Sequence, residues 1–421
     1  MTDNKDMLSA QLRATEQQKS GGGGEEEELS FASDRVKALV ICPASGNVVA
    51  THHSGLIQVL DPGSSFETIV STTLPHAVAV RAAAFVGNYL VVGDDAFTLT
   101  VLDPVTLAVV LSHEDAHGDY IRSIGLDPVH PRRFVTAGDD LLAHVWELAA
   151  DGTALTRLCT LEGAEHYVMG AAFNSAGTAI ATASLDQRLR IYAVPATLEP
   201  GAPVSRIAPR LSLTGHAKGI NCVAWMPGTD VVATGSDDTT VRVWDGASGA
   251  ALETVALHRH NVSTLAWARN GSCTLFSAGE DALVAATTFT GPEAWGATGT
   301  TVMSEATGGR VWALVERVNG DLVAGCDRGG LCLTSETWAS PGQTHAAGGA
   351  GAATGGGRAA VDPSDNDRVD QVDGVAARSP HVWVPDKTRG SCWHTVMLIV
   401  GIVVAAFVAA SAAAYSGKSL W

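Results

Sequence analysis

The chain has 421 residues, of which 46% are hydrophobic and 6% aromatic, with 45 glycines and 16 prolines, a composition typical of many short strands separated by turns. Its 44 acidic side chains outnumber 27 lysines and arginines and give a formal charge of -17. This charge argues against nucleic acid or anionic lipid as the main partner and favours a cationic ligand. The seven cysteines follow no pairing or metal-ligand spacing, which favours a reducing compartment.

Residues 1–28 are polar throughout. Four consecutive glycines, Gly21–Gly24, precede the glutamates Glu25–Glu28, and no apolar segment resembles a signal peptide. We expect residues 1–28 to form a disordered acidic arm that acts as a solubilising spacer.

The clearest pattern in the chain lies between His216 and Asp245. Two runs of alternating apolar and polar residues there precede a turn at Ser236–Asp238, and a further run closes on Trp244. This is the pattern of three short antiparallel strands. Such a unit cannot bury both of its faces alone, so it requires neighbours of the same kind stacked beside it.

Units of this kind recur along the chain, because the closing position returns roughly every 42 to 52 residues. Blades of WD-repeat propellers repeat every ~40–45 residues. We therefore predict an all-β fold, a seven-bladed WD-repeat β-propeller over residues 29–338, in which the segment from Leu29 to Phe31 supplies the outermost strand of the last blade. The closing positions are Leu60, Leu102, Trp146, Tyr192, Trp244, Thr287 and Leu333.

The C-terminal part changes character. Residues 339–394 are rich in glycine, alanine, serine and proline and predict a flexible linker. Thr395–Tyr415 carries no charge across 21 residues, and we predict a transmembrane helix there because about 20 apolar residues span a bilayer. Residues 416–421 would be a short lumenal tail. We expect a tail-anchored, single-pass protein whose N-terminal domain faces the cytosol, in the endoplasmic reticulum or Golgi membrane.

Some acidic residues have an expected structural role. Asp140, Asp186 and Asp238 each lie six residues before a closing aromatic, and we expect them to form hydrogen-bond networks inside their blades with His117, His166 and His216. We assign these residues to stability and not to catalysis. The sequence contains no phosphate-binding glycine loop, metal-ligand cluster or nucleophile motif, so we expect neither an enzyme nor a cofactor.

Other charges have no evident role in a blade. Asp139 and Asp237 each precede a structural aspartate and should point toward the rim of the ring, and Asp119 opens the third blade. Three cations, Arg35, Lys37 and Arg81, interrupt apolar strand patterns. Charges at such positions need partners or a water-filled mouth.

The segments HGDYIRSIGLDP, AGDDLLAHVWE and HYVMGAAFN, in this order and at these distances, resemble the first propeller of the coatomer beta-prime subunit of the COPI coat. The resemblance covers roughly residues 33–334. In that family the propeller binds the cytosolic C-terminal dilysine signals of membrane cargo.

The resemblance implies roles for individual residues. Arg35, Lys37 and Arg81 would hold the terminal carboxylate, because guanidinium and ammonium groups suit a carboxylate. Asp119 and Asp139 would bind the lysine third or fourth from the end, and Asp237 the lysine further back. His53 stands where the family usually has a tyrosine in the pocket wall.

The family continues into a second propeller and a helical solenoid, and this chain carries the linker and the predicted anchor in their place. We therefore expect a membrane-tethered reader of C-terminal cargo tails, or a scaffold in vesicle transport, with coat subunits as further partners. Two alternatives stay open. One is a membrane-anchored guanine-nucleotide exchange factor for a coat-recruiting small GTPase, and the other is a general WD-repeat scaffold whose cargo site has decayed.

Overall fold

The computed structural model describes residues 26–29, 34–195, 197–198, 204–291, 295–305 and 309–334. The chain divides into two units, residues 1–344 and 345–421, and every described residue belongs to the first unit. The described residues form 29 strands in seven sheets and one short 3-10 helix, η1 (Pro62–Ser64).

Each sheet is one blade of a propeller, and its strands are antiparallel neighbours in chain order except for β17 in the third blade and β1 in the last. The first three blades contain, from the inside outward, β2 (Val36–Ile41), β3 (Val48–His52), β4 (Leu56–Asp61) and β5 (Glu67–Thr73); then β6 (Val80–Val86), β7 (Tyr89–Asp94), β8 (Leu99–Leu102) and β9 (Val109–His113); then β10 (Ile121–Leu126), β11 (Arg133–Gly138), β12 (Ala143–Leu148) and β13 (Leu155–Leu161).

The remaining blades follow the same plan. They contain β14 (Val168–Phe173), β15 (Ala179–Ser184), β16 (Leu189–Ala193) and β18 (Leu211–Leu213); β19 (Ile220–Trp225), β20 (Val231–Ser236), β21 (Thr240–Asp245) and β22 (Ala251–Ala256); β23 (Val262–Trp267), β24 (Thr274–Gly279), β25 (Leu283–Phe289) and β26 (Ala297–Glu305); and β27 (Val311–Glu316), β28 (Leu322–Cys326) and β29 (Gly330–Leu333) with β1 (Glu26–Leu29).

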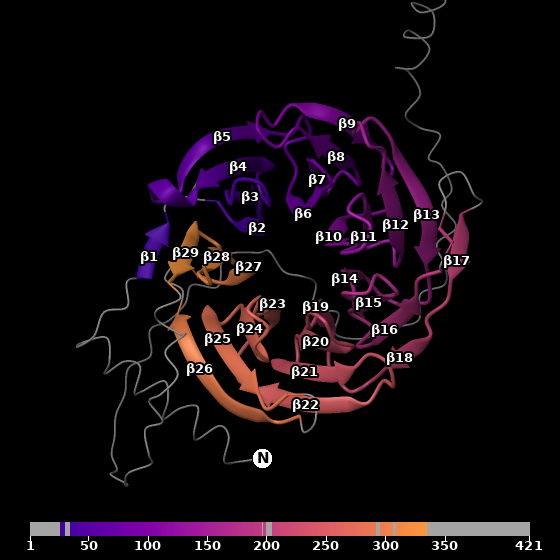
Figure 1. Ribbon diagram of the computed structural model, residues 1–421, viewed down its shortest axis with the longest axis vertical. Coiled ribbons are helices and arrows are strands. Elements are labelled where there is room, and N and C mark those ends of the chain that lie inside the picture. The colour runs from indigo at the N-terminus through magenta and orange to yellow at the C-terminus, as the bar shows by residue number, and fades with distance from the viewer. Residues whose placement is uncertain are drawn as a thin grey trace, which may run out of the picture. The chain divides into compact units, whose positions relative to one another are not determined.

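The blades close into a ring. The inner strands β2, β6, β10, β14, β19, β23 and β27 follow one another around its centre, and β27 contacts β2 (Figure 1). The predicted seven-bladed propeller is therefore confirmed. Antiparallel blades arranged in this way leave few exposed strand edges.

The N-terminal strand joins the first and last blades. β1 pairs antiparallel with β29, with Leu29 opposite Gly330 and Glu26 opposite Leu333 (Figure 1). The chain thus supplies the outermost strand of the last blade from its N-terminal side, as predicted, and the described strand, Glu26–Leu29, shares Leu29 with the predicted segment. It begins before residue 29, where we had placed the end of the acidic arm.

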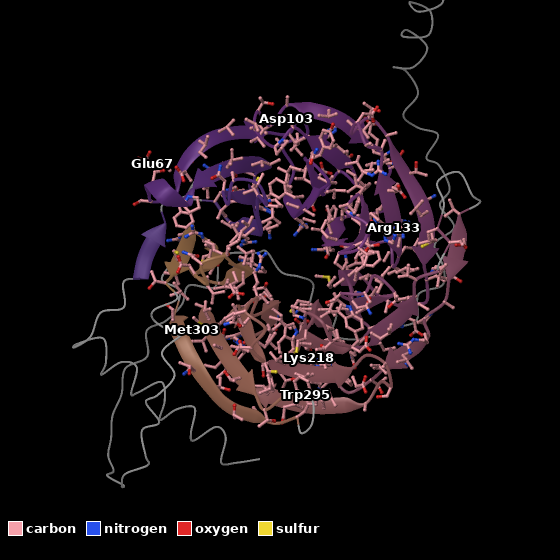
Figure 2. The ribbon with its side chains drawn as sticks, viewed as in Figure 1. Glu67, Asp103, Arg133, Lys218, Trp295 and Met303 are labelled. Atoms are coloured by element: carbon pink, nitrogen blue, oxygen red, sulfur yellow. The ribbon has the colours of Figure 1, made fainter. Side chains whose placement is uncertain are left out.

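The hydrophobic core lies between the blades. Each predicted closing position lies in the third strand of its blade and is at least 97% buried. One core cluster combines Val91 and Leu99 of the second blade with Ile121, Phe134 and Trp146 of the third. Figure 2 shows side chains filling the space between neighbouring blades. This packing explains why one blade cannot be stable without its neighbours.

The third blade has a fifth strand, which the repeat pattern did not predict. β17 (Ser205–Ile207) pairs in parallel with β13 before the chain returns to the fourth blade as β18. Arg133, labelled in Figure 2, donates a hydrogen bond to the carbonyl oxygen of Leu198 at 3.2 Å and so ties this inserted segment to the third blade.

Several predictions fall on residues outside the described part of the chain. These are the linker at 339–394, the transmembrane helix at 395–415 and most of the N-terminal arm. Among the described residues, no helix is long and apolar enough to cross a membrane.

Candidate functional site

A β-bulge is present near the start of every inner strand. In each blade the first and third residues of the inner strand pair with the second strand, and the residue between them is skipped. A bulge of this kind takes one residue out of the pairing and re-aims its side chain. The skipped residues are Lys37, Arg81, Arg122, Met169, Asn221, Ser263 and Trp312.

The residue after each second strand lies at the same end of the blade. Its N–H donates to the carbonyl oxygen of the residue that precedes the inner strand, at 2.9 to 3.1 Å in all seven blades. We call the surface formed by these residues and the skipped residues the loop face. The residues after the second strands are His53, Asp95, Asp139, Leu185, Asp237, Glu280 and Asp327.

Cations gather around one aromatic ring where the last blade meets the first. The guanidinium carbons of Arg35 and Arg310 lie 5.1 and 5.3 Å from the centroid of the Trp312 ring, and Lys37 Nζ lies 4.8 Å from it. Asp327 accepts hydrogen bonds from Trp312 Nε1 at 2.7 Å, from Arg35 Nε at 2.9 Å and from Arg310 Nε at 3.0 Å. We call these five residues the Trp312 cluster.

The electrostatics of the Trp312 cluster favour ionised groups. Burial alone would raise the pKa of Asp327, but the hydrogen bonds from Trp312 and Arg310 and the charges of Arg310 and Arg35 lower it overall. The cations in turn lie against an aromatic face, which attracts positive charge. The cluster therefore holds three cationic groups together at one point of the loop face.

A second cluster lies on the second and third blades. Arg81 forms a two-point ion pair with Asp95, including a contact of 2.7 Å from its Nη2. Arg122 forms a two-point ion pair with Asp139. Both guanidinium carbons lie within 6 Å of the Tyr120 ring centroid, at 5.4 Å for Arg81 and 5.7 Å for Arg122. We call these five residues the Tyr120 cluster.

The structure thus divides the predicted site residues. Arg35 and Lys37 belong to the Trp312 cluster, whereas Arg81 and Asp139 belong to the Tyr120 cluster. The prediction that cations interrupting inner strands need partners is confirmed for Arg35 and Arg81. The interpretation that Asp139 serves no blade contact is wrong, because this buried carboxylate is bound by Arg122 within its own blade.

The other predicted residues are placed separately. Asp119 lies in the loop before β10, and its carboxylate accepts a hydrogen bond from the N–H of Tyr120 at 2.8 Å. Asp237 lies in the fifth blade and accepts from Asn221 Nδ2 at 2.6 Å, and burial raises its pKa. It too has a partner in its blade, contrary to expectation. His53 is exposed on the loop face of the first blade, next to the Trp312 cluster through its N–H bond to the Arg35 carbonyl oxygen.

Sequence reasoning missed six residues of the two clusters: Asp95, Tyr120, Arg122, Arg310, Trp312 and Asp327. Two of them could have been found from the repeat. Arg122 follows Ile121 as Arg81 follows Val80 at the start of an inner strand, and Asp95 belongs to a Gly-Asp-Asp sequence as Asp139 does, although Asp95 is its last residue and Asp139 the middle one. Trp312 and Arg310 carry no such signal, because a tryptophan and not a cation fills the skipped position of the last blade, and Arg35 and Lys37, which share its ring, lie near the start of the chain.

The expected hydrogen-bond networks are present in two blades. His117 Nδ1 lies 2.9 Å from Asp140, and His216 Nδ1 lies 2.9 Å from Asp238. The prediction for His166 is wrong, because Asp186 pairs with Arg190 at 2.8 Å while His166 Nδ1 accepts from the N–H of Tyr167.

A further network, not predicted, joins His258 to Asp281 at 3.1 Å and to Ser277 at 2.9 Å. It repeats in the sixth blade the arrangement of the third and fifth blades. The histidine of this network, His258, is followed two residues later by a second histidine, His260, so the sequence alone does not show which of the two enters the network.

Comparison with known proteins supports the repeat assignment. Residues 155–193 and 208–245 match the family model described as WD domain, G-beta repeat. Coatomer subunit beta'-1 of Arabidopsis thaliana is 39% identical over 115 residues, 26% of this chain and 11% of that protein. Coatomer subunit beta'-2 of the same plant is 38% identical over 123 residues, 28% of this chain and 12% of that protein.

Similarity extends to a WD-repeat protein of another assembly. THO complex subunit 3 of Arabidopsis thaliana is 36% identical over 103 residues, 24% of this chain and 31% of that protein. The matched stretches thus span only a small part of each relative. The described part of the chain is therefore a seven-bladed propeller in which two stretches match the WD40 repeat model, with partial similarity to coatomer beta-prime subunits.

Proposed function

We propose that the loop face binds the C-terminal tail of a membrane protein that carries lysines near its terminus, in transport between the endoplasmic reticulum and the Golgi. The terminal carboxylate binds at the Trp312 cluster, with Arg81 beside it. The observation that carries this proposal is the convergence of Arg35, Lys37 and Arg310 on one Trp312 ring.

The chemistry of the Trp312 cluster suits a carboxylate. Guanidinium and ammonium groups donate charge-assisted hydrogen bonds to carboxylate oxygens, each worth about 1.5 to 3 kcal/mol. Asp327 holds both arginines at one edge of the indole and so pre-orients them. Pre-orientation lowers the entropy that binding must otherwise overcome.

The lysines of the tail bind on the acidic side of the loop face, and the three predicted carboxylates contribute unequally. Asp119 meets no cationic side chain within the described part of the chain, so an ammonium group can approach it directly. Asp139 is held by Arg122, and a lysine there has to compete with that ion pair. Asp237 has the neutral partner Asn221 and lies near Lys218.

We further propose that residues 395–415 anchor the protein in the membrane, with the propeller in the cytosol and coat subunits as additional partners. The uncharged 21-residue segment supports this proposal. Alkaline extraction of cell membranes tests it. The full chain should remain with the membrane pellet, and a variant with Val404 and Phe407 replaced by arginine should be released. Release of both forms would contradict the proposal.

The tail-binding proposal is tested by titrating the full chain into a fluorescent peptide that ends in two lysines and two further residues, beside the same peptide amidated at its C-terminus. We expect micromolar binding that amidation weakens at least tenfold, because about 1.4 kcal/mol corresponds to a factor of ten. Equal affinity for the two peptides would contradict a carboxylate site.

The variant Lys37→Gln sharpens this test. It removes one cation from the Trp312 cluster while leaving the ion pairs of Asp327 in place. Binding of the free-acid peptide should become about tenfold weaker, and binding of the amidated peptide should hardly change. Arg132→Gln is the matched control, because Arg132 lies in the β10–β11 loop at the opposite end of the blade. If both variants bind as the unmodified protein does, the carboxylate lies elsewhere.

A further inference from the structure

Two histidines and one aspartate of the third blade form a cluster that the tail-binding site does not use. The potential ligand atoms of His117, Asp140 and His144 all lie within 4.8 Å of one another. His117 and His144 are buried, and their ring centroids are 4.4 Å apart. None of these three residues belongs to the Trp312 cluster or the Tyr120 cluster, although Asp140 directly follows Asp139 of the Tyr120 cluster.

An open cavity of about 580 Å³ is lined by these three residues. The inserted segment that leads into β17 forms part of its wall, through Val204 and Arg206, and Arg157 of β13 forms another part. A small ion with its water therefore has a route to the cluster.

Each histidine is oriented by a hydroxyl group on its far side. His144 Nδ1 lies 3.0 Å from Thr160 Oγ1, and His117 Nε2 lies 2.7 Å from Thr136 Oγ1. When each of these nitrogens donates its proton to the threonine, His144 Nε2 and His117 Nδ1 present lone pairs to Asp140. Histidines that bind metals are commonly held by such a hydrogen bond from the other ring nitrogen.

The fold itself does not require His144. The fifth blade repeats the network of the third, with His216, Asp238, Thr234 and Trp244, but the residue opposite its threonine is Arg242. In the sixth blade the residue opposite Ser277 is Ala285. Among the described residues, His144 Nε2 makes no hydrogen bond and faces Asp140 Oδ2 at 3.9 Å, although His144 is 98% buried.

We propose that His117 Nδ1, the Asp140 carboxylate and His144 Nε2 bind a divalent transition metal ion, with zinc as the best match. Two imidazoles and a carboxylate are ligands that zinc takes at about 2.0 to 2.2 Å, with a fourth position for water or another ligand. The ligand atoms have to approach one another to about 3.3 Å, the separation that tetrahedral bonds of this length impose.

Binding requires a change of tautomer at His117. The proton that Nδ1 shares with Asp140 moves to Nε2, where Thr136 Oγ1 accepts it, and the metal takes the vacated lone pair. The net charge of the imidazole does not change. Asp140 keeps its hydrogen bonds from the N–H groups of Gly118 and Leu142 and so stays in place as a ligand.

The cavity also suggests what occupies the fourth position. Arg157 and Arg206 line it, and their charges oppose a bare cation. An anion such as a carboxylate or phosphate on the metal offsets both arginines. The site thus favours a metal that carries an anionic ligand over a fully hydrated ion.

Cobalt titration of the full, chelator-treated chain tests the proposal, because four- or five-coordinate cobalt has visible absorption bands that hydrated cobalt lacks. We expect one equivalent to give these bands and one equivalent of zinc to abolish them and raise the melting temperature. The variant His144→Gln should no longer bind this equivalent of cobalt. Thr160→Val, which removes only the orienting hydroxyl, should weaken binding about 10 to 100-fold.

Two further variants complete the design. His144→Arg copies the fifth blade and provides a folded variant lacking the ligand, should His144→Gln unfold. His166→Gln removes an exposed histidine outside the cluster and should keep the full equivalent. The proposal is overturned if the unmodified chain gives no such bands with cobalt, or if His144→Arg binds as the unmodified chain does.

Discussion

Arg122 Nε lies 2.7 Å from Asp139 Oδ1, and the two side chains form a two-point ion pair between the bulge of β10 and the end of β11. Asp139 is 95% buried, so its carboxylate depends on this partner. The side chain that the sequence assigned to an incoming lysine therefore already has a cation of the same blade. Arg81 and Asp95 repeat the arrangement one blade earlier.

Replacing Arg122 by glutamine should destabilise the propeller by about 3 kcal/mol or more, because it leaves a buried carboxylate without its cation. The double variant Arg122→Gln with Asp139→Asn should recover part of this loss. Urea unfolding of the four proteins gives the coupling energy between the two residues. Strictly additive losses would mean that the ion pair contributes nothing to folding.

The two aspartates near the Tyr120 cluster should differ in tail binding. Asp119→Ala should weaken the binding of a lysine-bearing peptide about tenfold, because it removes a carboxylate that an ammonium group can reach directly. Asp139→Asn should have a smaller effect, because its carboxylate is engaged with Arg122. Fluorescence titration with the two variants measures both effects. A larger loss for Asp139→Asn would reverse our assignment of the lysine position.

Equivalent threonines of two blades should respond differently to loss of the hydroxyl group. Thr234 Oγ1 lies 2.8 Å from His216 Nε2 and 2.9 Å from Trp244 Nε1, all in buried surroundings. Thr234→Val leaves both partners unsatisfied and should cost about 2 to 4 kcal/mol. Thr182 occupies the same place in the fourth blade, and its buried hydroxyl makes no hydrogen bond of normal geometry to the described residues.

Thr182→Val is therefore the matched control and should change stability by less than about 1 kcal/mol. The difference arises because the fourth blade closes on Tyr192, whose hydroxyl donates instead to the carbonyl oxygen of Glu162 at 3.0 Å. Chemical denaturation measures both variants. Equal losses would show that the volume of the side chain matters and the hydrogen bonds do not.

His144 should make the stability of the metal-free protein depend on pH. Burial, together with the charges of His117, Arg157 and Arg206, lowers the pKa of His144 from 6.5 to about 3. Between these values the unfolded chain binds the proton and the folded chain does not, so stability falls as the pH decreases below about 6.5. His144→Gln should remove up to about 1.4 kcal/mol per pH unit from this slope.

Unfolding at several pH values from 7 to 5, in the presence of a chelator, measures the slope. His166→Gln is the control for the loss of an exposed histidine. Parallel curves for the unmodified protein and His144→Gln would show that His144 takes up a proton in the folded state as readily as in the unfolded chain.

Removal of β1 should weaken the ring. A chain that starts at residue 30 loses the four paired residues between β1 and β29, and at about 1 kcal/mol for each hydrogen bond we expect a loss of about 2 to 4 kcal/mol. A chain that starts at residue 26 keeps β1 and should unfold like the full chain. Thermal unfolding compares the two truncations, and equal melting temperatures would mean that the ring closes without β1.

The sequence predicted the blades well because their signal is local. Alternation with a period of two marks each strand, and a buried residue such as Trp244 marks the third strand of a blade. The networks of His117 and His216 also followed from residues about 22 positions apart within one repeat. His166 misled us because its blade uses Arg190 as the partner of Asp186, and residue type alone does not show which partner is in reach.

By itself, the sequence determined the number of blades and their order. Only the tertiary structure decided which charges meet, because ring closure brings together residues that no local pattern connects. Arg35 and Asp327 are separated by 292 positions and form an ion pair. Likewise, His144 became a possible ligand only in the folded third blade, where its ring centroid lies 4.4 Å from that of His117.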